Sequence, residues 1–256
     1  KGNTMQYDFS FDTKDLTFLT TCNGAYHNFV APFIHFCKVS NPGCKIEIWA
    51  EKPDTLKFLN VPNVKIHQLP LEYHVATYRY IAEPTHRTKH TYITDIDIMH
   101  TELVQPFHLQ HMKETGLCFS NIQRIKKGEV GRLSGLHFVE TDTWYDLTSR
   151  IRSEIEPKGE DERMLFDIAG SICQIEKVSK GLSKRPIHGI HCSAGRNARA
   201  PYSSKGWEIT SQKLDILREE ILKVGMFNEW FETNVCSKLY DKKIISKINK
   251  RFPYGK

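Results

Sequence analysis

The chain has 256 residues, of which 39% are hydrophobic and 26% charged, so it is long enough for one large globular domain or a domain with an appendage. Its net charge of +6 is compatible with nucleic acid, an anionic membrane surface or a phosphorylated ligand, and equally with a mildly basic soluble protein. No apolar run approaches bilayer length, and no signal-peptide pattern is present. Seven cysteines without a Cys-x-x-Cys pair favour reduced thiols and a cytoplasmic setting.

Strand-like and helix-like patterns alternate along most of the chain. Strands are predicted at 16–22, 45–50, 64–69, from 89 into an Asp-x-Asp turn, and at 117–120, 135–140 and 172–178. Helices are predicted at 26–38, 72–83, 101–115 with Glu102 in its first turn, from about 142, and at 161–169. A basic loop with two histidines at 185–199 and a long amphipathic helix at 213–252 complete the chain. This alternation predicts an α/β domain with a mainly parallel sheet, whose ligands bind beyond the carboxyl ends of the strands.

Asp95 and Asp97 follow an apolar, β-branched run and are separated by one residue. Because an unpaired carboxylate is costly inside a strand, we expect both at the crevice beyond the strand end. Carboxylate oxygens there suit Mg²⁺ or Mn²⁺ bridging a diphosphate. The alternative is a solvated acidic turn.

Six blocks occur in a recognisable order, at 20–26, 76–80, 92–97, 133–138, 160–165 and 190–196. Together they resemble the GT-A-fold glycosyltransferases, most nearly glycosyltransferase family 8, the glycogenin-like and lipopolysaccharide galactosyltransferase group. The resemblance covers roughly residues 16–200 and implies a Rossmann-like, mainly parallel sheet flanked by helices. It implies a GT-A catalytic domain at 1–205, with a C-terminal helical extension at 206–256 packed on it.

The resemblance also implies a set of site residues. Asp95, Asp97 and His191 would hold the metal, with Asp95 alternatively on the donor ribose and His188 as a second candidate ligand. An imidazole ligand favours manganese over magnesium. The nucleotide-sugar donor would be bound by Thr21, Asn23, Tyr26, Arg79, Asp95, Ser134, Gly135 and Arg196. From residue type alone, Arg196 and Arg199, with Lys184 and Arg185, either clamp the diphosphate or form a solvated basic loop.

Two acidic residues are the catalytic candidates. The resemblance places Asp161 and Glu162 beside the reacting sugar or the acceptor, where a carboxylate orients a hydroxyl. Acidic residues in a first helical turn also simply favour the helix dipole, so that alternative stays open. His137 either faces the acceptor or is a half-buried strand residue.

These features predict a metal-dependent glycosyltransferase that moves a sugar from a nucleotide-diphosphate sugar, expected to be a UDP-sugar, to a glycan or polysaccharide hydroxyl. Retention at the anomeric carbon is implied by the resemblance. One alternative is a sugar-1-phosphate nucleotidyltransferase, for which residues 23–26 are a poor phosphate loop. Another is a non-catalytic module of a larger protein.

The basic C-terminal stretch at 213–251 leaves two interpretations open. It either contacts an anionic membrane peripherally or packs on the domain with a solvated basic face. No recognised nucleic-acid motif accompanies its charge, so no nucleic-acid partner is expected.

Overall fold

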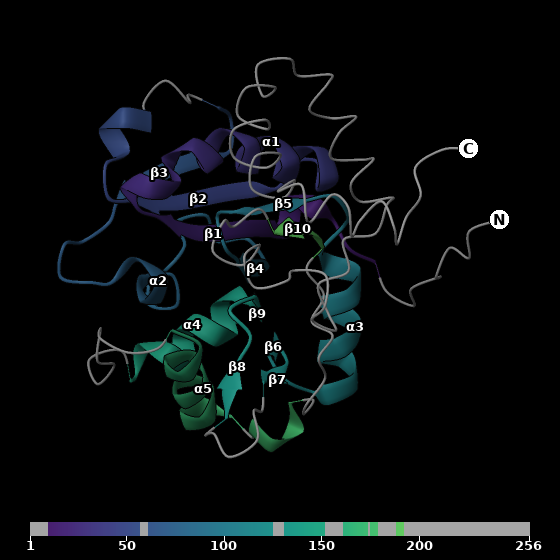
Figure 1. The fold of residues 1–256 in the computed structure, drawn as a ribbon. Helices are drawn as coiled ribbons and strands as arrows, with labels where there is room; N and C mark the ends of the chain where they lie inside the picture. Colours follow the sequence, from purple (N-terminus) through teal and green to yellow (C-terminus); the bar gives the residue numbers. More distant parts are fainter. Residues whose placement is uncertain are drawn as a thin grey trace, which may run out of the picture.

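A six-stranded sheet forms the centre of the computed structural model, which describes residues 10–56, 61–124, 131–151, 161–173, 175–178 and 188–191. The strand order is β3-β2-β1-β4-β9-β6 (Figure 1). The strands are β1 (Leu16–Cys22), β2 (Lys45–Ala50), β3 (Val64–Gln68), β4 (His90–Ile93), β6 (Phe119–Ser120) and β9 (His137–Glu140). The strands β1 to β4 are parallel, and β9 is antiparallel to both β4 and β6. The predicted α/β class with a mainly parallel sheet is confirmed.

Strand β1 lies between β2 and β4, and all seven of its residues are buried. A strand covered on both faces needs a nearly continuous apolar or β-branched run, which the sequence LTFLTTC provides. Its side chains alternate between two hydrophobic clusters: Phe18 belongs to one and Leu19 to the other. The sheet therefore separates two cores.

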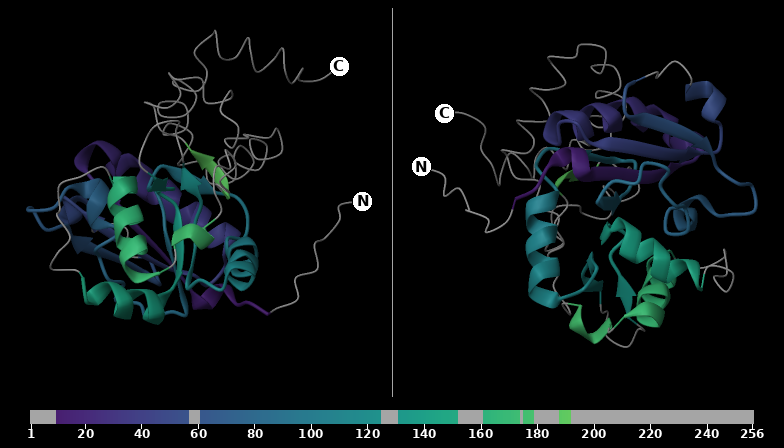
Figure 2. Two further views of the ribbon diagram at one scale, coloured as in Figure 1. Left: turned by 90° about the horizontal axis from the view of Figure 1, so that it is seen from below. Right: turned by 180° about the vertical axis from the view of Figure 1, so that it is seen from behind.

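Helices cover both faces of this sheet (Figures 1 and 2). Helix α1 (Val30–Ser40) packs on the Phe18 side, where α3 (Gln105–Thr115) also contributes side chains. Helices α4 (Thr141–Ser149) and α5 (Asp161–Ile172) pack on the Leu19 side together with residues that follow the single-turn helix α2 (Val75–Tyr78). The short 3₁₀ segments are η1 (Thr13–Asp15), η2 (Gly24–Phe29), η3 (Pro53–Leu56) and η5 (Ile175–Lys177).

Two small antiparallel pairs complete the fold. Strand β5 (Ile98–His100) pairs with β10 (Gly189–His191), and β7 (Gln123–Arg124) pairs with β8 (Arg132–Leu133). The first pair corrects the prediction of a loop at 185–199, because its described part contains a strand. Among the described residues, no helix is long and apolar enough to cross a membrane.

Several predicted boundaries are wrong. The segment 172–178 is not a strand, because α5 continues through Ile172, the amide of Cys173 still bonds to Ala169, and η5 follows. The helix predicted at 72–83 is reduced to Val75–Tyr78, and turns follow it. Helix α3 begins at Gln105, so Glu102 lies before the helix. The predicted helix at 26–38 divides into η2 and α1. The helix predicted at 213–252 lies outside the described residues.

Glu47 is a fully buried carboxylate on β2 that joins the sheet edge to the segment before β4. It accepts hydrogen bonds from His67 Nε2 at 2.9 Å, from the amide and hydroxyl of Thr85, and from the amide of His86. Burial raises the pKa of Glu47, but these hydrogen bonds outweigh burial and lower the pKa to about 2. The charged form of Glu47 is therefore specific to the folded chain.

We expect Glu47 to make folding acid-sensitive in a defined range. Because its folded pKa of about 2 lies below the ordinary 4.5, its contribution is complete above pH 4.5 and is lost as the pH falls towards 2. Between pH 7 and pH 3 the wild type should lose about 2 kcal/mol of unfolding free energy through this group. Urea unfolding at both pH values should show a smaller pH dependence for Glu47→Gln, with lower stability at pH 7.

The matched control is Glu114→Gln, because Glu114 is an exposed carboxylate on α3. It should keep the wild-type pH dependence. An equal pH dependence for Glu47→Gln and the wild type would contradict the assignment.

Candidate metal and donor site

The Asp-x-Asp turn lies at the carboxyl end of β4, as the sequence predicts. Strand β4 ends at Ile93, and the amide of Ile98 bonds to the carbonyl of Asp95 at 3.3 Å, which closes the turn before β5. The side chain of Asp97 is 7% exposed and that of Asp95 is 17% exposed. Both carboxylates are thus largely removed from water and need partners.

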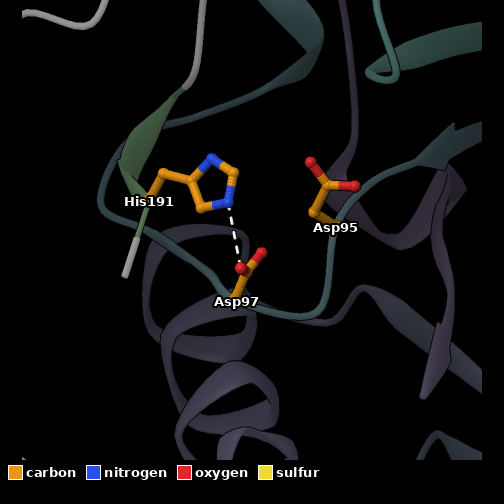
Figure 3. A group of neighbouring side chains, drawn as sticks. All are labelled: Asp95, Asp97 and His191. Atoms are coloured by element: carbon orange, nitrogen blue, oxygen red, sulfur yellow. Dashed lines mark ion pairs between the residues drawn. The ribbon is translucent and has the colours of Figure 1, made fainter. Parts of the chain in front are cut away.

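Strand β10 brings a distant histidine to this turn. It runs antiparallel to β5, with His191 opposite Ile98. His191 Nε2 lies 2.9 Å from Asp97 Oδ2, and Asp95 stands beside the pair (Figure 3). A Cβ at Gly189 would lie 2.0 Å from the carbonyl oxygen of Met99, so glycine is what allows β10 to approach β5 so closely.

Asp95, Asp97 and His191 fit a divalent cation. One ligand atom of each lies within 4.8 Å of the other two. Adjacent ligands of an octahedral ion with bonds of about 2.1 Å are about 3 Å apart, close to the observed separation of the Asp97 and His191 atoms. Two carboxylates and one imidazole suit Mn²⁺ in particular, because imidazole is a less favourable ligand for Mg²⁺.

The guanidinium of Arg79 connects this group to the start of α5. Arg79 is 5% exposed and donates to Asp95 Oδ1 through one terminal nitrogen and to Asp161 Oδ2, at 3.0 Å, through the other. Burial lowers the pKa of Arg79, but the charges of Asp95 and Asp161 raise it well above its usual value. Arg79 is therefore a fixed cation between two of the predicted site carboxylates.

Ser134 and Gly135 form a turn that lies against Arg79. A Cβ at Gly135 would lie 3.1 Å from a terminal nitrogen of Arg79, which explains a small residue there. Tyr80 Oη donates to the Gly135 carbonyl at 3.0 Å, and the Gly135 amide is 3.3 Å from Glu162 Oε1. The amide of Ser134 donates to Asn121 Oδ1 at 3.0 Å.

Glu162 differs from Asp161 in its surroundings. It is 8% exposed, pairs with Arg124, and lies 3.9 Å from Arg132. Asp161 keeps 30% of its side chain exposed. Of the two catalytic candidates, Asp161 is thus the more accessible to a ligand.

The residues predicted to bind the base lie at the end of β1. The hydroxyl of Thr21 donates to the Val75 carbonyl at 2.6 Å, so it ties β1 to α2. Asn23 Oδ1 is buried and has no hydrogen-bond partner among the described residues. Tyr26 packs against Phe29, with ring centroids 5.6 Å apart.

Two further histidines are singled out by the sequence, His188 as a second candidate ligand and His137 as a residue that faces the acceptor or is half-buried in a strand. His188 bonds to Glu102 and His108 instead. His137 is a strand residue as predicted, but it is fully buried between Phe119 and Trp144 where half-burial is expected, and burial lowers its pKa to about 3.

Several contacts are missing from the sequence analysis. Asn121, Arg124 and Arg132 lie in none of the six blocks, and Tyr80, which ends the block at 76–80, has no predicted role there; together they support the turn at Ser134 and Gly135, directly or through Glu162. The four predicted basic residues Arg196, Arg199, Lys184 and Arg185 lie outside the described residues.

Comparison with known proteins gives fold likenesses only. No family model matches the chain, and no curated protein matches it. Among solved structures, the galactosyltransferase LgtC in complex with donor and acceptor sugar analogues is 12% identical, with a TM-score of 0.43 over 79% of this chain and 82% of LgtC. The glycosyltransferase GlyE of Streptococcus pneumoniae TIGR4 is 13% identical, with a TM-score of 0.46 over 82% of this chain and 63% of GlyE.

A synthase is also similar in fold. The 4-diphosphocytidyl-2C-methyl-D-erythritol synthase of Anaerococcus prevotii DSM 20548 is 9% identical, with a TM-score of 0.41 over 61% of this chain and 85% of that enzyme. At identities and scores this low, none of these likenesses decides the function. It has to be argued from the residues of the site.

We expect Arg79 to be essential for stability as well as for the site. Arg79→Met leaves Asp95 and Asp161 without their shared cation, which should lower the free energy of unfolding by about 3 kcal/mol. Adding Asp161→Asn to the same chain should recover part of that loss, as urea unfolding of the single and double variants would measure.

Arg87→Met is the matched control. Arg87 also contacts two carboxylates, Glu83 and Asp142, but its side chain is 46% exposed. Its loss should lower stability by less than about 1 kcal/mol. Equal losses for the two arginines would refute a buried ionic link at Arg79.

Proposed function

We propose that the chain is a metal-dependent glycosyltransferase that uses a nucleotide-diphosphate sugar, with a UDP-sugar as the expected donor. One observation carries the proposal: the Asp95, Asp97 and His191 ligand atoms lie within 4.8 Å of one another beside the Arg79–Asp161 pair. This grouping lies beyond the carboxyl end of β4, where ligands of parallel sheets bind.

Asp95, Asp97 and His191 would hold Mn²⁺, or Mg²⁺ as the alternative. The ion would supply positive charge that neutralises the diphosphate as it leaves the sugar. Arg79 donates a hydrogen bond to Asp95 and fixes its orientation, so the carboxylate does not have to reorganise when ligands bind.

Asp161 is the carboxylate we assign to the sugar. Its Oδ2 accepts from Arg79 and its Oδ1 from the amide of Glu162, and both contacts fix its position while part of the group stays exposed. From there it would accept a hydrogen bond from a sugar or acceptor hydroxyl. The catalytic role of Glu162 stays a prediction. Its carboxylate already accepts hydrogen bonds from Arg124 and from the amide of Gly135.

In the transfer, the bond between the anomeric carbon and the diphosphate oxygen breaks, and a bond to the acceptor oxygen forms. With retention, the acceptor hydroxyl approaches on the face that the diphosphate leaves, and its proton passes to the leaving phosphate oxygen. Ser134 and Gly135, small residues beside Arg79, would leave room for the donor sugar.

Further parts of the proposal concern the rest of the chain. Asn23 and Tyr26 would bind the base, Thr21 would support them, and Arg196 would contact the diphosphate. We propose a catalytic domain at 1–205 and a helical extension at 206–256, a cytoplasmic location, and peripheral membrane contact through the basic extension. A glycan or polysaccharide would be the acceptor.

The test is release of nucleoside diphosphate from a panel of sugar nucleotides with Mn²⁺. We expect slow hydrolysis of one donor, abolished by a chelator and reduced at least ~100-fold in Asp97→Asn. Asp142→Asn, which changes an aspartate whose side chain is 81% exposed, should retain the wild-type rate.

Each alternative has its own outcome. Release of pyrophosphate from a nucleoside triphosphate and a sugar 1-phosphate would favour the nucleotidyltransferase. Absence of both donor binding and metal binding would overturn the enzyme proposal in favour of a binding module.

A further inference from the structure

His188, three residues before the predicted metal ligand His191, lies in a hydrogen-bond network of its own. Its side chain is 4% exposed. Its Nδ1 is 3.2 Å from Glu102 Oε1, and its Nε2 is 2.9 Å from Nε2 of His108 on α3. The residue thus joins the start of β10 to helix α3 and to the segment before that helix.

The backbone around His188 is held in an unusual conformation. The φ angle of His188 is 45°, in the left-handed region that side chains other than glycine seldom adopt. Its carbonyl accepts from the amide of Thr101 at 2.9 Å, and Gly189 follows in close contact with Met99. Strained positions of this kind persist only where surrounding contacts hold them, and they concentrate at functional sites.

Aromatic rings fix the plane of the His188 imidazole. The rings of Tyr92 and Phe107 meet it edge-on, each with centroids 6.0 Å away, and the ring of His108 meets it at 4.9 Å. With its plane fixed, the imidazole directs Nδ1 to Glu102 and Nε2 to His108.

The donors and acceptors of this network form one directed chain. A carboxylate accepts but does not donate, so His188 Nδ1–H donates to Glu102. His108 is neutral, because burial first and the neighbouring His188 second lower its pKa well below the usual value. We assign the proton between the two Nε2 atoms to His108, so that His188 accepts at Nε2 from His108 Nε2–H. His108 Nδ1 in turn accepts from the Ser120 hydroxyl, 2.8 Å away.

We infer that His188 is a positioning residue, whose hydrogen bonds to Glu102 and His108 hold β10 on β5 and thereby keep His191 beside Asp97. His191 is positioned by strand β10, which is three residues long. A three-residue pairing alone is a weak support for a ligand, and the His188 contacts supply a second attachment point. Outer groups that orient a ligand in this way typically contribute 10–100-fold to metal affinity.

The first test needs no metal. Nitrogen NMR of the imidazoles should show the Nδ1–H tautomer for His188 and the Nε2–H tautomer for His108. Amide exchange at residues 98–100 and 189–191 should accelerate in His188→Ala. His188→Asn keeps a donor near the Nδ1 position and tolerates positive φ, so it should restore much of the protection. The opposite tautomers, or unchanged exchange in His188→Ala, would overturn the inference.

The second test measures Mn²⁺ affinity by the loss of the free-ion EPR signal, and it rests on the proposed function. His188→Ala should weaken binding about 10- to 100-fold, and His188→Asn should restore most of it. His90→Ala is the control for general destabilisation, because His90 is a buried histidine that starts β4, at the end away from the Asp-x-Asp turn. It should bind Mn²⁺ like the wild type.

The outcomes separate the two proposals. If the wild type fails to bind Mn²⁺, the metal assignment fails, while tautomers and exchange still decide the role of His188. If the wild type binds and His188→Ala binds equally well, the positioning role fails and the proposed function stands.

Discussion

The buried guanidinium of Arg79 is the interaction on which the site depends. A cation that is 5% exposed is not stable without anions in contact, so the fold has to bring Asp95 and Asp161 to it. Arg79 directly follows α2, Asp95 lies in the turn after β4, and Asp161 starts α5, so the three residues come from segments far apart in the sequence. The two ion pairs of Arg79 connect the turn after the parallel strand β4 to the start of helix α5. They also orient one predicted metal ligand before any metal arrives.

The sheet could be predicted from the sequence wherever burial on both faces dictates a residue type. The run at 16–22 gives β1 with its observed bounds, because a covered parallel strand tolerates little besides apolar and β-branched side chains. The run at 45–50 gives β2 with its observed bounds through its alternation of polar and apolar residues. Short apolar runs lack that constraint. The run at 172–178 is compatible with a strand or with the end of a helix, and the amide of Cys173 settles it by continuing the α5 pattern. Helix α3 begins at Gln105, whereas the sequence predicts a start at 101. The amide of Val104, just before the helix, bonds to the side chain of Asn41, and no local sequence pattern contains such a tertiary contact.

The candidate site likewise contains residues that the sequence predicts and residues that it does not. Asp95 and Asp97 follow from a strand that ends in acids, and the resemblance to GT-A glycosyltransferases predicted His191 beside them. The residues that support the site could not be found by pattern. Asn121 contacts Ser134 across 13 positions, Arg124 pairs with Glu162 across 38, and His188 reaches His108 across 80. Such contacts depend on the tertiary fold, which brings distant segments of the chain together. A histidine in a basic loop was therefore a reasonable second metal candidate until the geometry gave it other partners.

The net charge of the site limits which residues can neutralise the negative charge of a diphosphate. Asp95, Asp97 and Asp161 carry three negative charges against the one positive charge of Arg79, so a divalent cation brings the group only to neutrality. Arg124 and Arg132 share one carboxylate, Glu162, so together these three residues add one net positive charge. Residues 1–191 contain 23 Lys and Arg and 23 Asp and Glu, whereas residues 192–256 contain 13 basic and seven acidic residues. The whole net charge of +6 thus comes from the last quarter of the chain. This charge balance supports the proposed contact of Arg196 with the diphosphate, because the described residues give a metal-loaded site one excess positive charge against the two negative charges of a nucleotide-diphosphate sugar.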